Sequence, residues 1–242
     1  MSPINEEYKY EKQLESIFGL EIMQAIVLLN TPRQGVIKQD VEKFCHDARW
    51  DIVSRTRKRM EASRTELHFI PYGTVSKWPG EGNKKSTLSY KRPDQNNGEV
   101  RLSGKRSVGF AGHVDSIDYV RSPKGVIYAY QTLRASFIRE VDEELRFYHP
   151  GLGKFVTIAD DPEYFCVEAR GFIYDTTDDV GKTHLGVYFD VEVQPVLEVT
   201  SGEEDAIEDV KWQTGFELDD TIDVYENWSQ FIISADLAPV VG

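Results

Sequence analysis

The chain has 242 residues, of which 40% are hydrophobic, which is enough to bury the core of one large domain or of one domain with an extension. Its 28 Lys and Arg against 41 Asp and Glu give a formal net charge of −13, which argues against non-specific binding to nucleic acid or anionic membranes. The two distant cysteines, Cys45 and Cys166, exclude a disulfide framework and match no metal-ligand spacing. The longest apolar run, residues 22–29, is too short to span a bilayer, and the N-terminus lacks a signal-peptide pattern, so we expect a cytoplasmic protein.

Residues 1–63 are predicted to form a mostly helical N-terminal extension. Within residues 37–63, Val41, Phe44 and Ala48 recur at helical spacing. The apolar stretch AIVLL, residues 25–29, is compatible with a short buried strand as well.

From Glu66 the pattern changes to alternating apolar residues separated by Gly- and Pro-rich turns. Strands are expected at residues 66–78, 86–92, 106–115, 164–175 and 184–196 and around Val210, and helices at residues 127–147 and 226–237. Strands on both sides of a central helix predict an α+β fold, an α/β/α sandwich, for a domain of residues 64–242.

The central helix carries a dense acidic cluster in the stretch REVDEEL, residues 139–145. Glu140, Glu143 and Glu144 are spaced i, i+3 and i+4, so their side chains share one helix face. Arg139 lies four residues before Glu143 and can orient it by a charge-assisted hydrogen bond. Carboxylates crowded in this way suit a hard divalent cation such as Mg²⁺ or Mn²⁺.

This stretch resembles the signature of the Nudix hydrolase superfamily, Gly-x5-Glu-x7-Arg-Glu-U-x-Glu-Glu-x-Gly-U, in which U is a bulky aliphatic residue. The second half of the signature is matched at Arg139, Glu140, Val141, Glu143 and Glu144. Arg146 stands where the signature has its last glycine, and Phe147 where it has its last aliphatic residue. Because that glycine normally ends the helix, Arg146 suggests a helix running on to Tyr148.

The first half of the signature can be aligned in two ways. The literal spacing selects Gly125 and Gln131, with glutamine in place of the glutamate. The other alignment selects Gly112, which follows a predicted strand, and Asp118, with the surplus residues in a loop. We favour the second alignment because it satisfies the strand context. Beyond the signature, residues 64–237 resemble a phosphoesterase-like subgroup of Nudix proteins.

The resemblance implies a metal-dependent hydrolase that cleaves the pyrophosphate bond of a nucleoside diphosphate linked to another moiety. Glu140, Glu143 and Glu144 would hold Mg²⁺ or Mn²⁺, with Arg139 as a catalytic-site residue. The resemblance also implies a general base outside the signature. The acidic loop that includes Glu203 offers Glu204 as first choice and Glu208 as second, although Ser201-x-x-Glu204 also has the form of a helix capping box.

Substrate contacts are expected at Gly112, His113, Arg92 and Arg106. His113 follows the signature glycine and is either a structural polar residue or a hydrogen-bond partner of a phosphate. If the strands ending at Arg92 and beginning near Arg106 pair, their cations gather where they can bind phosphates. Ordinary solvation of strand ends is the alternative.

Two other functions stay open. One is a non-hydrolytic Nudix-like module that binds a nucleotide and regulates another process. The arginine at position 146, where the signature has glycine, favours it. Isomerase chemistry on a prenyl diphosphate requires a suitably placed cysteine and glutamate, for which Cys166 is weak support. The expected partner is a small-molecule nucleotide, with no duplex nucleic acid and no membrane, and a homodimer is a possible assembly.

Overall fold

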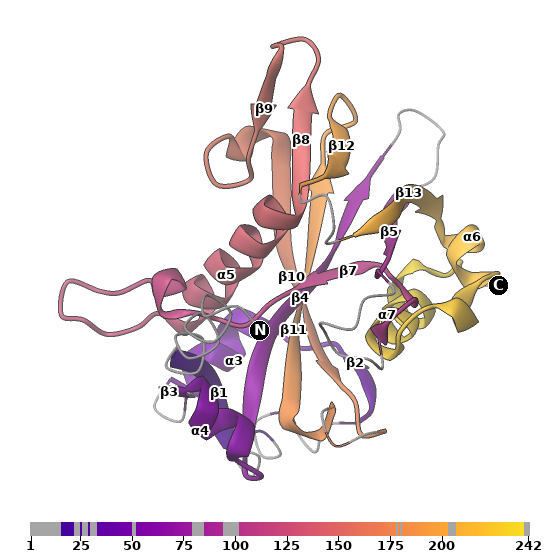
Figure 1. Ribbon diagram of the computed structural model, residues 1–242. Coiled ribbons are helices and arrows are strands. Elements are labelled where there is room, and N and C mark those ends of the chain that lie inside the picture. The colour runs from indigo at the N-terminus through magenta and orange to yellow at the C-terminus, as the bar shows by residue number, and fades with distance from the viewer. Residues whose placement is uncertain are drawn as a thin grey trace, which may run out of the picture. The chain divides into compact units, whose positions relative to one another are not determined.

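A computed structural model shows the arrangement of the chain (Figure 1). It describes residues 16–21, 25, 29, 33–49, 52–78, 85–93, 102–177, 179, 181–202 and 207–239. Across these residues, none of the helices has the length and apolar character needed to cross a membrane.

The strands and helices alternate irregularly along the described chain. The strands are β1 (Ser16–Glu21), β2 (Gly35–Ile37), β3 (Ile52–Thr56), β4 (Glu66–Lys77), β5 (Ser86–Lys91), β6 (Arg106–Ser107), β7 (Gly109–Ala111), β8 (Leu145–His149), β9 (Lys154–Val156), β10 (Phe165–Tyr174), β11 (His184–Val193), β12 (Glu198–Ser201) and β13 (Glu208–Thr214). The α-helices are α3 (Val41–Asp47), α4 (Arg57–Ala62), α5 (Ala129–Glu144), α6 (Gly215–Asp219) and α7 (Asn227–Ile232).

Most of these strands belong to one sheet, in which the hydrogen-bonded order is β13-β5-β4-β11-β10-β2. A second, three-stranded sheet has the order β12-β8-β9. The combination of a large sheet with helices confirms the α+β fold predicted from the sequence.

The chain forms two compact units. Unit 1 comprises residues 1–71, 112–136 and 171–187, and unit 2 comprises residues 72–111, 137–170 and 188–242. The expected division into an extension of residues 1–63 and a domain of residues 64–242 stays a prediction.

The N-terminal segment contains strands where the sequence predicted mostly helix. In unit 1, β1 pairs with β3 and with β4, so that Gly19 lies opposite Val53 on one side and His68 on the other. The sequence of β3, IVSRT, is rich in β-branched residues, and pairing with a neighbouring strand stabilises such residues more than an isolated helical period does.

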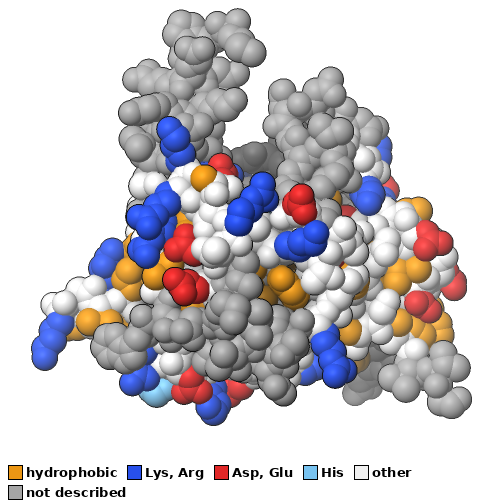
Figure 2. Space-filling view, turned by 90° about the horizontal axis from the view of Figure 1, so that it is seen from below, with side chains coloured by type: hydrophobic (Ala, Val, Ile, Leu, Met, Phe, Trp, Pro, Cys, Tyr) orange, Lys and Arg blue, Asp and Glu red, His pale blue; other side chains and the backbone are white. Residues whose placement is uncertain are grey.

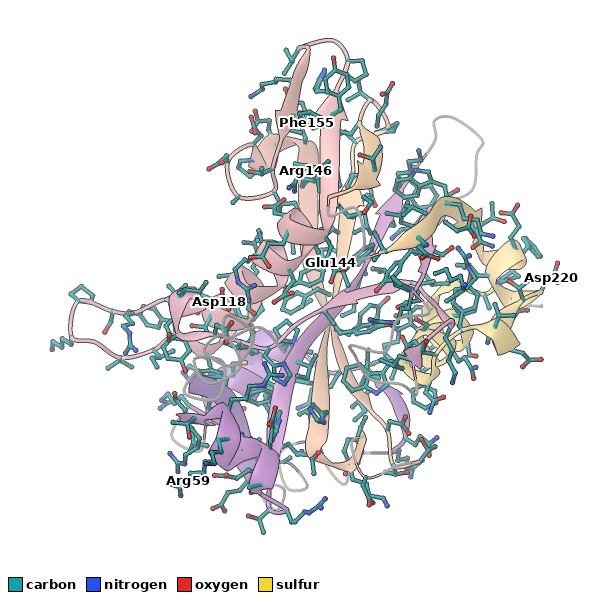
Figure 3. The ribbon with its side chains drawn as sticks, in the orientation of Figure 1. Arg59, Asp118, Glu144, Arg146, Phe155 and Asp220 are labelled. Carbon is teal, nitrogen blue, oxygen red and sulfur yellow. The ribbon has the colours of Figure 1, made fainter. Side chains whose placement is uncertain are left out.

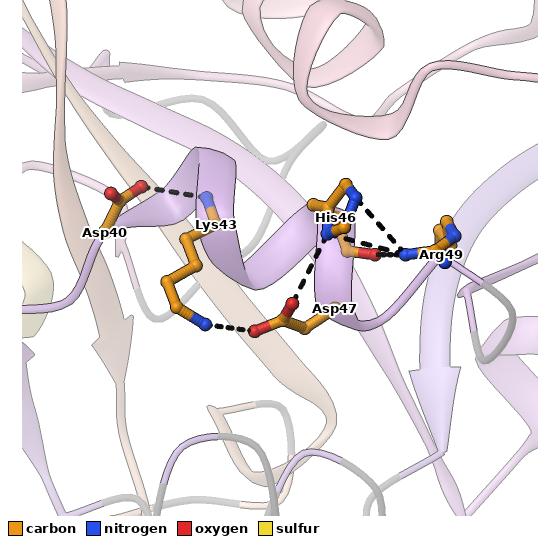
Figure 4. Close-up of polar contacts among 5 residues, drawn as sticks. All are labelled: Asp40, Lys43, His46, Asp47 and Arg49. Atoms are coloured by element: carbon orange, nitrogen blue, oxygen red, sulfur yellow. Dashed lines mark hydrogen bonds and ion pairs between the residues drawn. The ribbon is translucent and has the colours of Figure 1, made fainter.

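Helix α3 fits its helical prediction because both its cap and its apolar face are satisfied. The carboxylate of Asp40 accepts a hydrogen bond from the backbone N–H of Lys43 at 2.8 Å, as Figure 4 shows. Phe44 is buried, and its ring centroid lies 4.7 Å from that of Phe172 and 6.5 Å from that of Phe69. These contacts hold α3 against the sheet strands of unit 1.

The two cysteines differ in their surroundings, and neither forms a disulfide. Cys45 is buried in α3, and this burial raises the pKa of its thiol to about 12. Cys166 is exposed on β10. Its position in an alternating strand places it on the outward-facing side.

In unit 2, the C-terminal half of α5 packs closely onto a glycine of the sheet. A Cβ atom on Gly73 would lie 2.5 Å from Cζ of Phe137, so only glycine leaves room for this ring. Phe137 also stacks on Phe189, with 5.0 Å between ring centroids. The C-terminal half of α5 is therefore fixed by aromatic packing.

A buried polar cluster holds the last helix of unit 2. The carboxylate of Glu226 caps α7 by accepting hydrogen bonds from the backbone N–H groups of Trp228 and Ser229, at 2.9 and 3.1 Å. The hydroxyl of Tyr72 donates to the same carboxylate, and the ring of Trp228 packs edge-on against Tyr72 with 5.3 Å between centroids. Trp228 thus packs the final helix against Tyr72 of the sheet.

Candidate metal centre on helix α5

The buried side of α5 fixes which side chains are left for chemistry. Leu133, Phe137 and Val141 are fully buried, and their spacing of four residues marks one face of the helix. Glu140 and Glu144 are half-buried beside this face, and the side chain of Glu143 is 54% exposed. The three glutamates therefore lie between core and solvent, where an ion from solution can reach them.

Arg139 bridges two of the three glutamates. Its guanidinium lies 2.8 Å from Oε1 of Glu140 and 3.1 Å from Oε2 of Glu143. The contact with Glu143 is the i, i+4 pair predicted from the sequence. Because adjacent like charges repel, the arginine reduces the cost of holding these carboxylates together.

Asp142, the fourth acid of the cluster, has a structural role. Its carboxylate accepts hydrogen bonds from the backbone N–H groups of Ile158 and Ala159, at 2.9 and 3.3 Å. Burial raises the pKa of this carboxyl above its ordinary value, against the opposite effect of the two backbone donors. Asp142 thus ties the loop after β9 to α5.

Helix α5 ends at Glu144, which corrects the prediction that it runs on to Tyr148. Residues 145–149 form β8 instead, where Leu145 and Phe147 are buried in the alternating pattern of a strand. Figure 3 labels Glu144 and Arg146 on either side of this junction. Strand pairing with β12 and β9 takes over these backbone groups, so the helix cannot continue.

Gly202, from outside the signature, and Arg146, at the position of its last glycine, satisfy the end of the helix. The backbone N–H of Gly202 donates to the carbonyl of Glu144 at 2.7 Å. Arg146 donates from its guanidinium to the carbonyl of Asp142 at 2.9 Å. A Cβ on Gly202 would lie 2.5 Å from the carbonyl oxygen of Glu143, so this close approach requires glycine.

The helix boundary distinguishes the two alignments of the signature. Gln131 lies inside α5, which begins at Ala129, whereas the literal spacing required a helix starting after Gln131. Gly112 follows directly on β7, and residues 119–128 form an irregular loop with a single bridge between Arg121 and Ile127. Gly112 therefore has the strand context that the second alignment requires, and its membership of the signature stays a prediction. Gly112 belongs to unit 1 and the glutamates to unit 2.

The two predicted phosphate-binding arginines come from paired strands. Lys91 at the end of β5 lies opposite Arg106 in β6, so these strands do pair. Arg106 is bonded to the carboxylate of Asp209 and donates to Ser89 Oγ at 2.9 Å. The pKa of Arg92 is raised, chiefly by the neighbouring Tyr90. Cζ of Arg92 lies 5.7 Å from the centroid of the Tyr90 ring. Arg92 therefore keeps its charge although it is largely enclosed.

The expected general bases differ in what the structure shows. Glu203 and Glu204 lie outside the described residues. Glu208 is exposed at the start of β13, opposite Lys91 of β5, next to an irregularity in the strand register. Its role as a base stays a prediction.

A group of histidines that the sequence did not predict is present in unit 1. His68, His113 and His184 bring ring nitrogens within 4.8 Å of one another. Of these, the sequence had singled out only His113, as a substrate contact. Among the described residues, these three side chains place their candidate ligand atoms within 4.8 Å of one another, whereas assembly of the three glutamates around an ion stays a prediction.

The fold is that of the Nudix superfamily, as the resemblance in the sequence predicted. The solved structure of Tm1382, a protein provisionally assigned as a Nudix hydrolase, matches 91% of this chain and 97% of its own with a TM-score of 0.66. The two sequences are 20% identical, so this likeness establishes the fold alone.

One curated protein and a further solved structure are also similar to the chain. Protein YmaB of Bacillus subtilis strain 168 is 27% identical over 221 residues, which cover 86% of this chain and 95% of YmaB. The NUDIX domain of Shewanella oneidensis NrtR, solved with ADP ribose, is a more distant structural neighbour, with a TM-score of 0.42, 15% identity, and coverage of 72% of this chain and 88% of its own. No family model matches the chain.

Proposed function

We propose that this protein is a metal-dependent hydrolase that cleaves the pyrophosphate bond of a nucleoside diphosphate linked to another moiety. The observation that carries the proposal is the acidic face of α5, where Arg139 bridges Glu140 and Glu143 on a Nudix fold. A fold by itself does not define an activity, so these side chains are the feature that supports a hydrolase.

The side chains on this face fit a hard divalent cation. Glu140, Glu143 and Glu144 would hold Mg²⁺ or Mn²⁺ through oxygen ligands, which both ions prefer. When bound, such an ion would neutralise the charge that develops on the phosphoryl oxygens. Arg139 then keeps Glu140 and Glu143 oriented, and the packing of Phe137 keeps the helix in place.

Arg92 is the better of the two candidates for binding a substrate phosphate. Arg106 is already engaged by Asp209 and Ser89. The guanidinium of Arg92 remains charged, and its Nε is buried with no hydrogen-bond partner among the described residues. A phosphate offers oxygens in the plane of such a group. Gly112 is also proposed as a substrate contact through its backbone.

A carboxylate outside the signature would accept the proton of the attacking water, since the signature glutamates serve as ligands. Glu204 remains the first choice and Glu208 the second. A small-molecule nucleotide partner, a cytoplasmic location and a homodimer are further expectations of the same proposal. On the face shown in Figure 2, Lys and Arg side chains lie among Asp and Glu side chains.

The proposal is tested with a panel of nucleoside diphosphates linked to sugars, nucleosides or other groups, each incubated with Mg²⁺ or Mn²⁺ and analysed by product mass. We expect cleavage of the pyrophosphate bond of at least one compound. Glu143→Gln should lower kcat/KM by at least about tenfold, because even an outer partner of a metal ligand has an effect of that size. Glu163→Gln, at an exposed glutamate of unit 2, should keep full activity.

Two outcomes contradict the proposal. If a nucleotide binds but no bond is cleaved with either ion, the protein is a non-hydrolytic binding module. If Glu143→Gln and Glu140→Gln both keep full activity on a cleaved substrate, the acidic face of α5 is not the catalytic centre.

A further inference from the structure

Three histidines from distant parts of the sequence converge in unit 1. His68 lies in β4, His113 follows β7 by two residues, and His184 begins β11. One ring nitrogen from each lies within 4.8 Å of the others, and the ring centroids of His68 and His184 are 4.7 Å apart. The centroid of His113 lies 6.4 Å from that of His68 and 6.2 Å from that of His184.

His68 is the most unusual of the three because its polar atoms are buried. The residue is 1% exposed, and in the described part of the chain neither Nδ1 nor Nε2 makes a hydrogen bond of good geometry, although the backbone of Met60 is near enough to raise the pKa of the ring. Leaving a buried polar atom without a partner costs about 1–3 kcal/mol, so such atoms usually serve a ligand or a water. Burial lowers the pKa of His68, against the opposite effects of the Met60 backbone and of Glu61 and Glu66, which favours the neutral ring.

The other two histidines are half-buried, and a neighbouring hydroxyl contacts each of them. The carbonyl of His113 accepts a hydrogen bond from Ser136 Oγ at 3.3 Å. Nδ1 of His184 lies 3.3 Å from Oγ1 of Thr183, in a short helical turn that is packed closely enough to require Gly181. The three rings therefore project from three separate segments of backbone, and those of His113 and His184 are partly accessible to solvent.

From this convergence we propose that His68, His113 and His184 form a binding site for a divalent transition metal of the zinc class, with a fourth coordination position open. Neutral imidazole nitrogens are good ligands for zinc, and three of them with one open position form a well-known kind of zinc centre. Tetrahedral zinc with Zn–N bonds of about 2.0–2.1 Å places its nitrogens about 3.4 Å apart. The three nitrogens already lie within 4.8 Å of one another, so small rotations of the side chains are enough to reach that separation.

Other roles for the group fit less well. A phosphate would require protonated rings, and three imidazolium groups at this separation would repel one another. Mg²⁺ prefers oxygen ligands and is a poor match for three nitrogens. The histidines share no residue with the acidic face of α5, so this site does not depend on the proposed hydrolase activity.

The test is metal content in the full-length protein. The chain is stripped with a chelator, loaded with Zn²⁺ in the presence of excess Mg²⁺, desalted and measured by elemental mass spectrometry. We expect about one zinc per chain. His113→Gln and His184→Gln, at half-buried positions, should each weaken zinc binding by at least about tenfold. The controls are the other two histidines of the chain, His46→Gln and His149→Gln, which should keep the zinc.

Retention of zinc by both His113→Gln and His184→Gln would overturn the proposal. Loss of zinc from Glu143→Gln but not from the histidine variants would also overturn it. Because a variant can fail to fold, Co²⁺ is added to the unmutated protein as an independent probe. A site with nitrogen ligands and tetrahedral geometry gives strong visible absorption bands. If saturating Co²⁺ produces no such bands, the three-histidine site does not exist.

Discussion

At the scale of residues, the acidic cluster of α5 is tolerated because its members have different partners. Arg139 neutralises part of the charge of Glu140 and Glu143, while Asp142 accepts backbone N–H groups of Ile158 and Ala159. The i, i+3, i+4 spacing was enough to predict which acids share a face. The role of Asp142 could not be predicted, because its partners are backbone atoms of a loop formed later in the chain.

Tyr72 provides a residue-scale prediction about stability. Its hydroxyl donates to the buried carboxylate of Glu226 and lies 2.9 Å from Ser229 Oγ. Tyr72→Phe removes a donor from a carboxylate that is 5% exposed, so the free energy of unfolding should fall by about 1–3 kcal/mol. Chemical denaturation followed by circular dichroism measures this change.

The matched control is Tyr128→Phe, at an exposed tyrosine, which should change the free energy of unfolding by less than about 0.5 kcal/mol. Equal stability of the two variants would show that the Tyr72 hydroxyl contributes nothing to the buried cluster.

At the scale of elements, the end of α5 shows both what the sequence predicted and what it missed. The existence of the helix and its acidic face followed from periodicity. Its end did not, because Arg146 replaced the expected glycine and β8 pairs with strands that come later in the chain. Gly202, which is far from the helix in sequence, packs closely against its last turn and donates a hydrogen bond to the carbonyl of Glu144. Local pattern reasoning has no access to such a contact.

The N-terminal segment was misjudged for the same physical reason. Residues 52–56 continue a helical period from α3, yet they form β3 because β1 offers a strand to pair with. Strand formation depends on partners that a single sequence does not reveal, whereas α3 is short and locally capped by Asp40. The sequence therefore predicted the core strands of the Nudix fold better than the elements added before them.

Gly202 gives an element-scale prediction. In Gly202→Ala, the new Cβ would lie 2.5 Å from the carbonyl oxygen of Glu143, so either the helix end or β12 must move. We expect a loss of about 1–3 kcal/mol in the free energy of unfolding, the usual cost of overpacking. Activity on a cleaved substrate should fall as well, because Glu143 and Glu144 are displaced. Gly151→Ala is the control, since its Cβ would meet only the side chain of His149, at 3.1 Å. Unchanged melting of Gly202→Ala would show that this contact is not tight.

At the scale of the whole molecule, the two candidate metal groups differ in how they could be found. The glutamates lie within one stretch of five residues, which a motif can predict. The histidines come from β4, the segment after β7 and the start of β11, and only the folded chain brings them together. They have no linear spacing typical of a zinc motif. Oxygen ligands on α5 and nitrogen ligands in unit 1 are expected to select different ions.

Metal removal is therefore expected to affect the stability of the chain in a way that separates the two groups. An ion that binds only the native state stabilises it by RT ln(1 + [L]/Kd), or about 2.7 kcal/mol at a concentration of 100 Kd. For the chelator-stripped protein, Mn²⁺ should raise the melting temperature in a concentration-dependent way. The double variant Glu140→Gln/Glu143→Gln should lose this rise, whereas His184→Gln and the exposed control Glu163→Gln should keep it. Differential scanning calorimetry over a Mn²⁺ titration measures the shifts. An equal rise in the double variant and the unmutated chain would show that Mn²⁺ binds elsewhere than the acidic face of α5.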